Sequence, residues 1–145
     1  MMDRSAVTVV IPTRDRPHLL ALTLRSVLGQ HDVDLEVVLV DDGDGPSTAA
    51  VADATADPRV RIVRNRGPRG ECGARNCGIA PARREWVASC ADDDLWAPGK
   101  LAAQLSAVLD EGTQWVYAGD VNVDNSGRII TRGARSHGIF AQSVG

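Results

Sequence analysis

Three consecutive carboxylates, Asp92, Asp93 and Asp94, are the residues of this 145-residue chain best suited to chemistry. They follow the apolar run 86–91, which is typical of a short buried strand. Adjacent carboxylates repel one another, and a divalent cation would relieve that repulsion. Mg²⁺ and Mn²⁺ prefer carboxylate oxygens and commonly share their coordination shell with substrate phosphates. The triplet therefore indicates a metal site; the alternatives are solvated loop residues or an Asp94 placed near the N-terminus of the next helix.

Polar residues also follow two earlier strand-like runs. The segment 12–15 follows the run 7–11, and Asp41 and Asp42 follow the run 35–40. Ligands of open α/β sheets bind beyond the carboxyl ends of the strands. An acidic edge with an arginine beside it suits a metal-bridged diphosphate together with ribose hydroxyls or the N–H of a base. The sequence contains neither a GxGxxG dinucleotide motif after the first strand nor a P-loop, which disfavours both of those phosphate sites.

The hydrophobic pattern predicts strands alternating with helices from residue 7 to about residue 118. Strands are expected at 7–11, 35–40, 60–63, 86–91 and 115–118, and helices at 17–28, 46–56, 74–82 and 98–111. A hairpin is expected at 121–130, and the weakly patterned tail from Gly133 is expected to be poorly ordered. We expect Gly70, Gly73 and Gly78 to allow turns and close packing rather than to touch phosphate. This order predicts one α/β domain, 1–145, with a mostly parallel sheet, helices on both faces and a C-terminal hairpin.

Composition excludes several classes of protein. The formal charge is −3 and no basic stripe with interleaved aromatic residues occurs, so we expect no nucleic-acid partner. No apolar stretch approaches the roughly 18 residues of a membrane span, so the expected location is the cytoplasm, with peripheral membrane association left open. The three cysteines lack CxxC spacing, which indicates neither zinc nor a disulfide framework.

Four motifs together resemble the family 2 glycosyltransferases. They are Val-Val-Ile-Pro-Thr-Arg-Asp-Arg at 9–16, Val-Asp-Asp-Gly at 40–43, Gly-Ala-Arg-Asn-Cys-Gly-Ile at 73–79 and Asp-Asp-Asp-Leu-Trp-Ala-Pro-Gly-Lys-Leu at 92–101. The resemblance covers about residues 5–131. It implies a Rossmann-like GT-A fold and transfer of a sugar, with inversion, from a nucleotide-diphosphate donor with the help of Mg²⁺ or Mn²⁺.

The resemblance also implies roles for individual residues. Asp42 would bind the base, Arg75 would lie by the base or the phosphates, and Asp92 would contact the ribose. Asp93 would coordinate the metal, and Asp94 would ligate it through water or brace Asp93. The residues implied in the nucleotide-sugar site are Pro12, Thr13, Arg14, Asp15, Asp42, Arg75, Asp92 and Asp93.

Some of these residues have a structural alternative. Asp15 could cap the first helix or sit in a turn, and Arg75 could form a salt bridge on the surface of its helix. We expect Asp41 to serve a turn rather than a ligand, and Trp96 to pack behind the metal loop.

Two departures from the family pattern limit the prediction. Ala91 stands where many members carry the first Asp of a DxD motif. The part of the family that holds the acceptor site and the general base has no counterpart here, and neither Asp120 nor Asp124 is assigned as that base. We therefore expect the donor-binding part of a glycosyltransferase with an unknown acceptor, or, alternatively, a non-catalytic nucleotide-sugar-binding or regulatory module. Apolar surface where a missing part would pack leaves a homodimer open.

Overall fold

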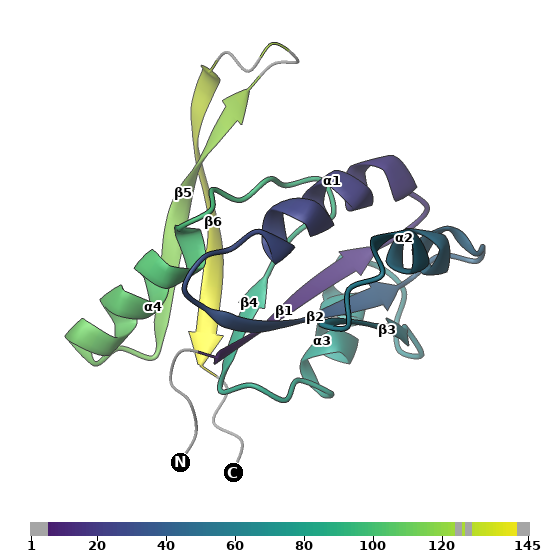
Figure 1. Ribbon diagram of the computed structural model, residues 1–145, viewed down its shortest axis with the longest axis horizontal. Helices are drawn as coiled ribbons and strands as arrows, with labels where there is room; N and C mark the ends of the chain where they lie inside the picture. Colours follow the sequence, from purple (N-terminus) through teal and green to yellow (C-terminus); the bar gives the residue numbers. More distant parts are fainter. Residues whose placement is uncertain (1–5, 124–125, 127–128, 142–145) are drawn as a thin grey trace.

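The computed structural model describes residues 6–123, 126 and 129–141 (Figure 1). The strands of these residues form one sheet in the spatial order β3-β2-β1-β4-β6-β5. The strands are β1 (Ala6–Thr13), β2 (Asp34–Asp41), β3 (Val60–Arg64), β4 (Trp86–Ser89), β5 (Trp115–Val123) and β6 (Ile129–Ala141). The helices are α1 (Pro17–Leu28), α2 (Ser47–Thr55), α3 (Glu71–Ile79) and α4 (Lys100–Glu111).

The sheet is mostly parallel, as the sequence predicts. β1 pairs in parallel with β2 on one side and β4 on the other, and β3 pairs in parallel with β2. β6 is antiparallel to β4, and β5 is antiparallel to β6. In Figure 1 the ribbon of β5 and β6 projects well beyond the helices. Four parallel strands thus end at one edge of the sheet, where the chain must turn into its loops.

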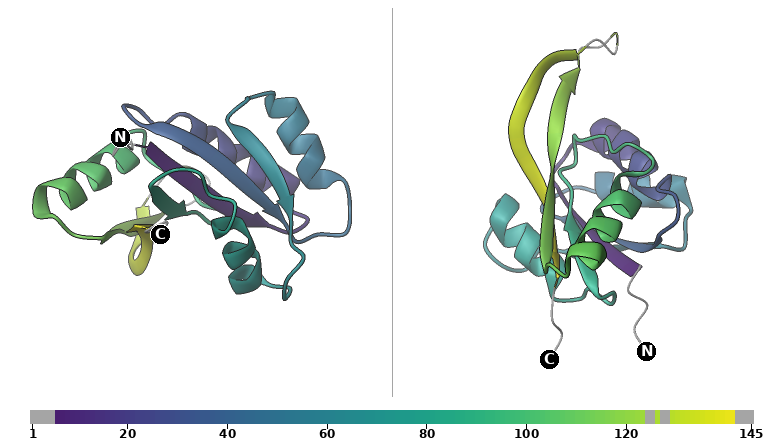
Figure 2. Two further views of the ribbon diagram at one scale, coloured as in Figure 1. Left: turned by 90° about the horizontal axis from the view of Figure 1, so that it is seen from below. Right: turned by 90° about the vertical axis from the view of Figure 1, so that its left-hand side faces the viewer.

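Helices cover both faces of the sheet (Figure 2), which confirms that prediction. Strand side chains alternate between faces, so β1 supplies Val9 and Ile11 to one core and Val10 to the other. The larger core includes residues of α1, α2 and α4, whereas the smaller one includes Ala74 of α3. Both faces of β1 and β2 are buried, which explains their continuous β-branched runs.

Two glycines let the chain pack closely around α3. A Cβ on Gly78 would lie 2.4 Å from Val10 Cγ1, and one on Gly73 would lie 1.9 Å from the carbonyl oxygen of Pro68. Gly70, the residue before α3, has a φ of 107°, which favours glycine. The expected role of these glycines in turns and packing is confirmed.

A buried carboxylate joins the first two strands to the loop before β4. Glu36 accepts hydrogen bonds from Thr8 Oγ1 at 2.7 Å, from the backbone N–H of Arg83 at 2.8 Å and from Arg61 at 3.4 Å. Burial raises the pKa of Glu36, but these hydrogen bonds outweigh it and hold the pKa below its usual value of 4.5. The side chain is therefore ionised and structural.

Several predicted boundaries were wrong: β4 ends at Ser89 rather than at 91, and α3 ends at Ile79 rather than at 82. α3 begins at Glu71 rather than at 74, because Gly70 and Gly73 belong to the tight entry of the helix. α4 begins at Lys100 rather than at Pro98, and Gly99 occupies its N-cap position. Asp94 therefore lies well before the helix, and the alternative of a helix-terminal role for it is wrong.

The expected disorder after Gly133 was also wrong. Residues 129–141 form a continuous strand whose end pairs with β4, from Trp86 opposite Ala141 to Ala88 opposite Ile139. The hairpin itself is present, with β5 extending to Val123; of the residues expected at its turn, 125–127, positions 125 and 127 lie outside the described residues. Pairing with a strand more than forty residues earlier in the chain decides this element, and local sequence patterns do not carry that information.

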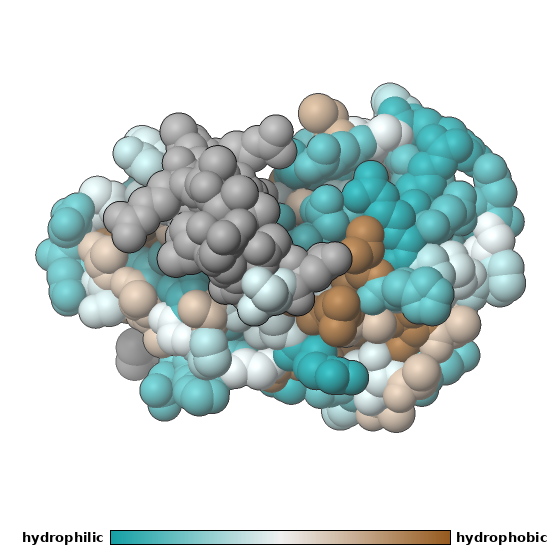
Figure 3. All heavy atoms as spheres, turned by 90° about the horizontal axis from the view of Figure 1, so that it is seen from above, coloured by the Kyte–Doolittle hydropathy of each residue, from teal (hydrophilic) through white to brown (hydrophobic). Residues whose placement is uncertain are grey.

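Most of the surface seen in Figure 3 is hydrophilic, with one small apolar patch. The described residues nevertheless include exposed large apolar side chains on β5: Trp115 and Tyr117 are 58% and 60% exposed, and their rings stack with centroids 5.7 Å apart. Within the described part of the chain, no helix has the length and apolar character required for a membrane span. The homodimer stays a prediction.

Candidate functional site

The ends of β1, β2 and β4 bring the predicted polar residues to one edge of the sheet. Thr13 pairs with Asp41 in the β1–β2 register, and the backbone N–H of Asp42 donates to the carbonyl of Thr13 at 2.9 Å. The chain after β4 stays close to β1, because the N–H of Cys90 donates to the carbonyl of Val10 at 3.0 Å. The acidic triplet therefore begins beside the end of β1.

Asp92 is held from two sides. Its side chain is 9% exposed, and its Oδ2 accepts a hydrogen bond from Thr13 Oγ1 at 2.9 Å. Its backbone carbonyl accepts one from Thr23 Oγ1 of α1 at 2.9 Å. Hydrogen bonds to a charged group are about twice as strong as neutral ones. Asp92 is thus fixed in both backbone and side chain.

One face of α1 clamps the loop that follows. Thr23 and Ser26 lie one turn apart on α1, and Gln30 lies just beyond the end of that helix. Ser26 Oγ accepts from the backbone N–H of Trp96 at 3.1 Å, and Gln30 donates to the carbonyl of Ala97 at 2.8 Å. The loop 92–98 is therefore held along its length by polar side chains of a neighbouring helix.

Asp93, in contrast, faces outward. Its side chain is 48% exposed, and its Oδ2 lies 3.5 Å from Arg16 NH1. The same nitrogen lies 3.4 Å from Asp92 Oδ1, so the guanidinium bridges both carboxylates. One acid of the triplet is fixed and its neighbour is presented to the surroundings.

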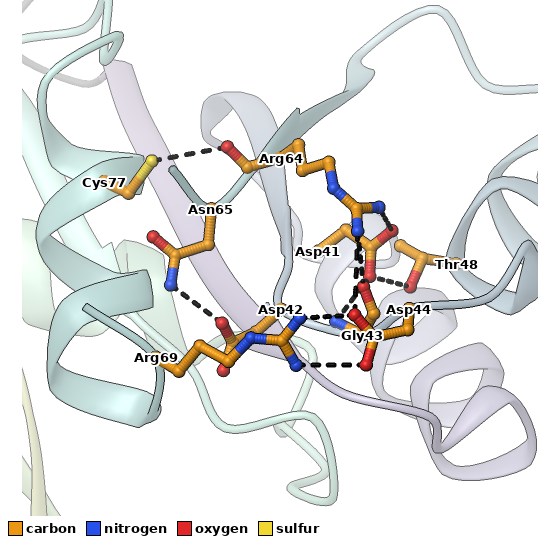
Figure 4. Close-up of polar contacts among 9 residues, drawn as sticks. All are labelled: Asp41, Asp42, Gly43, Asp44, Thr48, Arg64, Asn65, Arg69 and Cys77. Atoms are coloured by element: carbon orange, nitrogen blue, oxygen red, sulfur yellow. Dashed lines mark hydrogen bonds and ion pairs between the residues drawn. The ribbon is translucent and has the colours of Figure 1, made fainter. Parts of the chain in front are cut away.

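Asp42 is oriented by the loop before α3 (Figure 4). Its two carboxylate oxygens accept hydrogen bonds from Asn65 Nδ2 at 2.8 Å and from the backbone N–H of Gly70 at 2.9 Å. These hydrogen bonds hold the pKa of Asp42 below its usual value of 3.8. The carboxylate is therefore an ionised acceptor at the edge of the sheet.

Asp41 has the turn role that the sequence predicts. Its Oδ1 accepts from the backbone N–H of Gly43 at 3.0 Å and from Thr48 Oγ1 at 3.2 Å, and Arg64 lies 3.7 Å from its Oδ2. The next acid, Asp44, pairs with Arg69, which holds the pKa of Asp44 below its usual range. Figure 4 shows this network between the end of β2 and the loop after β3.

Asp15 belongs to a turn and does not cap α1. Its φ is 52°, and the N-cap position is held by Arg16, whose side chain makes no capping hydrogen bond. A Cβ on Gly43 would lie 2.6 Å from Asp15 Oδ1, so the two loops touch. Asp15 is thus close to the Asp42 loop.

Three other residues predicted for the site, Pro12, Arg14 and Arg75, differ in their exposure and contacts. Pro12 is buried within β1 opposite Val40, whereas Arg14 is exposed. Arg75 pairs with Glu71 one turn away on α3, at 2.6 Å. The salt bridge that was the alternative for Arg75 is therefore present, and its contact with a base or phosphates stays a prediction.

Behind the acidic loop, Trp96 packs in the larger core with 7% of its surface exposed, as expected. Lys100 Nζ lies 4.1 Å from the centroid of the Trp96 ring and 2.7 Å from Gln104 Oε1. Burial lowers the pKa of Lys100 to about 8. The floor of the loop is thus apolar except for one cation.

Comparison with known proteins identifies the family. Residues 8–141 match Glycosyl transferase family 2, which is most of the chain. The chain belongs to glycosyl transferase family 2.

Relatives of this family 2 chain act on sugars. It is 34% identical to the succinoglycan biosynthesis protein ExoO of Rhizobium meliloti, a match covering 94% of this chain and 37% of that protein. It is 27% identical to a UDP-Glc:alpha-D-GlcNAc-diphosphoundecaprenol beta-1,3-glucosyltransferase of Escherichia coli, over 89% of this chain and 51% of that protein. The chain therefore spans between about a third and a half of these relatives.

Solved structures agree on the fold. A mannosyltransferase from Pyrobaculum calidifontis, in complex with GDP-Man and Mn²⁺, has a TM-score of 0.66 and 29% identity, covering 75% of this chain and 34% of that one. The S. aureus protein TarS with UDP-GlcNAc has a TM-score of 0.68 at 20% identity, over 87% of this chain and 37% of that one, a likeness that shows the fold alone. The predicted GT-A fold is confirmed.

The carboxylates of this family 2 chain fit a divalent cation whose remaining coordination positions are filled by a bound ligand. Among the described residues, no three His, Cys, Asp or Glu side chains gather in a way that could hold a metal ion. Mg²⁺, however, is commonly bound by one or two carboxylates together with substrate phosphates and water. The outward Asp93, with Asp94 next to it in the same loop, would supply such carboxylates beside the fixed Asp92.

Sequence reasoning missed Arg16 and Asn65 at this site. Arg16 lies one residue beyond the segment 12–15 that was examined, within the same polar stretch. Asn65 follows β3 directly, so the rule used for the other strand ends would have found it. Asp120 and Asp124, neither of which is assigned as the general base, have side chains outside the described residues.

Proposed function

We propose that this chain binds the nucleotide-diphosphate sugar donor of a metal-assisted, inverting glycosyltransferase. One observation carries the proposal: Asp92 is fixed by Thr13 and α1, while the adjacent Asp93 presents a half-exposed carboxylate at the edge of the sheet. In this proposal Asp93 coordinates Mn²⁺ or Mg²⁺, with Asp94 ligating through water or bracing it. The ribose contacts Asp92, and the base contacts Asp42.

The chemistry suits these residue types. When bound, the metal offsets the negative charge that grows on the departing nucleotide diphosphate. The ionised Asp42 is an acceptor for the N–H of a base, and the segment 12–15 with Arg75 would line the rest of the pocket. An ionised carboxylate accepts hydrogen bonds from N–H groups, and a cation attracts phosphates. The site therefore matches a ligand that has both.

An inverting transfer also needs a general base to take the proton of the acceptor hydroxyl. We assign this base, and the acceptor contacts, to a part of the protein outside residues 1–145. The matches to 37% and 51% of the two relatives' lengths support that assignment. The acceptor itself is unassigned, and the domain boundary at 145, the cytoplasmic location and peripheral membrane association stay proposals.

The names of the relatives suggest which nucleotides to test first as parts of the donor. One relative is named for UDP-Glc, and the mannosyltransferase of known structure was solved with GDP-Man and Mn²⁺. UDP and GDP are therefore the first ligands, each titrated calorimetrically with and without Mn²⁺. We expect metal-dependent binding of one of them.

The variant Asp93→Asn tests the assignment, because it keeps the shape of the side chain and removes its charge. We expect it to abolish the dependence of nucleotide binding on Mn²⁺. The matched control is Asp53→Asn, which removes an exposed carboxylate on α2. Metal-independent binding by the wild-type chain, or unchanged metal dependence in Asp93→Asn, would refute the proposal.

A further inference from the structure

Arg16 lies against Asp92 and Asp93, the two carboxylates proposed to contact the ribose and the metal. Its NH1 lies 3.4 Å from Asp92 Oδ1 and 3.5 Å from Asp93 Oδ2, within ion-pair distance of both. It supplies the positive charge that the acidic pair requires in the ligand-free chain. Any divalent cation approaching these two oxygens meets a guanidinium already there.

The local structure gives Arg16 no other reason to be a cation. It is the N-cap residue of α1, yet its side chain makes no capping hydrogen bond. A positive charge at a helix N-terminus is also disfavoured by the helix dipole. Its backbone carbonyl accepts the hydrogen bond from Leu20 at 2.9 Å, a contact that any side chain at this position would keep.

The Arg16 side chain can also move away from the two carboxylates. It is 53% exposed, and its guanidinium lies within ion-pair distance of the two carboxylates. Half-exposed ion pairs are weak, so a stronger anionic partner can displace them. Arginine binds phosphate oxygens in a bidentate geometry that carboxylates at 3.4 and 3.5 Å do not provide here.

We propose that Arg16 is a counter-cation that couples metal binding to diphosphate binding. In the absence of a nucleotide it neutralises Asp92 and Asp93 and weakens binding of the metal. When a nucleoside diphosphate binds, the guanidinium moves to the phosphates and leaves Asp93 to the metal and Asp92 to the ribose. Arg16 is thus a positioning residue that makes the two ligands bind cooperatively. The inference rests on the proposed function, because it takes the metal and the diphosphate from it.

The test compares metal binding with and without a nucleotide. Free Mn²⁺ is measured by its electron paramagnetic resonance signal during titration of each variant, alone and with saturating UDP or GDP. Association of Mn²⁺ with the nucleotide in solution is the same for all variants and cancels in the comparison. The quantity of interest is the factor by which the nucleotide tightens Mn²⁺ binding, which linkage makes reciprocal.

Arg16→Gln should bind Mn²⁺ alone roughly tenfold more tightly than the wild type, because two weak ion pairs no longer compete. The factor by which the nucleotide tightens binding should fall by a similar amount, since the diphosphate loses its arginine. Arg16→Lys, which retains the charge, should stay near the wild type in metal affinity without a nucleotide. Arg25→Gln, an exposed charge on the same helix, is the matched control and should change neither quantity.

The outcomes separate this inference from the proposed function. If wild-type Mn²⁺ binding is tightened by the nucleotide but Arg16→Gln binds Mn²⁺ alone no better, the counter-cation role is refuted and the donor site stands. If no variant binds Mn²⁺ with or without either nucleotide, both proposals fail. Circular dichroism checks that Arg16→Gln is folded, and Arg16→Met, which keeps the apolar stem, replaces it in the same comparison if it is not.

Discussion

The packing of α3 against the sheet allows a direct test of the fold that positions the site. Gly78 lies where α3 crosses β1 and β2, and a Cβ there would be 2.4 Å from Val10 Cγ1 and 2.6 Å from Val40 Cγ2. Carbon atoms in contact prefer about 3.5–4.0 Å. Both valines are fully buried and their β-branched side chains rotate little, so Gly78→Ala must lift α3 or distort both strands.

The size of the effect follows from two opposing terms. Overpacking a core costs about 1–3 kcal/mol, whereas replacing glycine by alanine in a helix gains at most about 1 kcal/mol. We expect Gly78→Ala to lower the free energy of unfolding by roughly 1–2 kcal/mol, or Tm by roughly 3–6 °C for a chain of this size. Urea unfolding followed by tryptophan fluorescence measures the first quantity.

Two further variants isolate the cause. Val10→Ala removes the nearer clashing atom and leaves Val10 Cβ at 3.5 Å from the added methyl group, while the 2.6 Å approach to Val40 Cγ2 remains. The double variant should therefore be less destabilised than the sum of the single variants, by about 1 kcal/mol. Gly45→Ala, whose Cβ would meet nothing within 4 Å, should change stability by no more than about 0.5 kcal/mol. If Gly78→Ala is as stable as the wild type and additive with Val10→Ala, the close packing of α3 is refuted.

Two other predictions address single polar side chains. Thr13→Val removes the donor to the buried Asp92 Oδ2 and should lower the free energy of unfolding by about 1.5–3 kcal/mol in urea, while Thr13→Ser should remain close to the wild type. Because the pKa of Glu36 is held below 4.5 in the folded chain, its ionised form stabilises the fold above about pH 4.5, and this contribution is lost as pH falls through the lower, folded pKa. Glu36→Gln should therefore show a shallower loss of stability between about pH 5 and pH 3 in urea titrations, and an unchanged slope would contradict this assignment.

The sequence was sufficient for the parts of the site that local pattern and sheet geometry determine together. Thr13, Asp42 and Asp92 each follow a buried strand, and parallel strands bring such residues to one edge. The place of Arg16 in the site could not be predicted in this way, because its contact with the acids depends on the direction of a long side chain at the start of a helix. β6 required a pairing between residues far apart in the chain, and nothing in its own pattern reports that partner.

The structure adds a difference in exposure between two neighbours of the acidic triplet. In sequence Asp92 and Asp93 are equivalent neighbours, yet their side chains are 9% and 48% exposed. The difference arises because Thr23 and Ser26 of α1, with Gln30 just beyond its end, fix the loop with the Asp92 side chain buried and the Asp93 side chain exposed. A fixed acid beside a presented one can accept a metal only together with another charged ligand, since two carboxylates leave most of its coordination positions open. The carboxylates alone leave the coordination shell of the metal incomplete, and Arg16 balances their charge in the ligand-free chain. For these two reasons, binding of the metal and binding of the nucleotide would depend on each other.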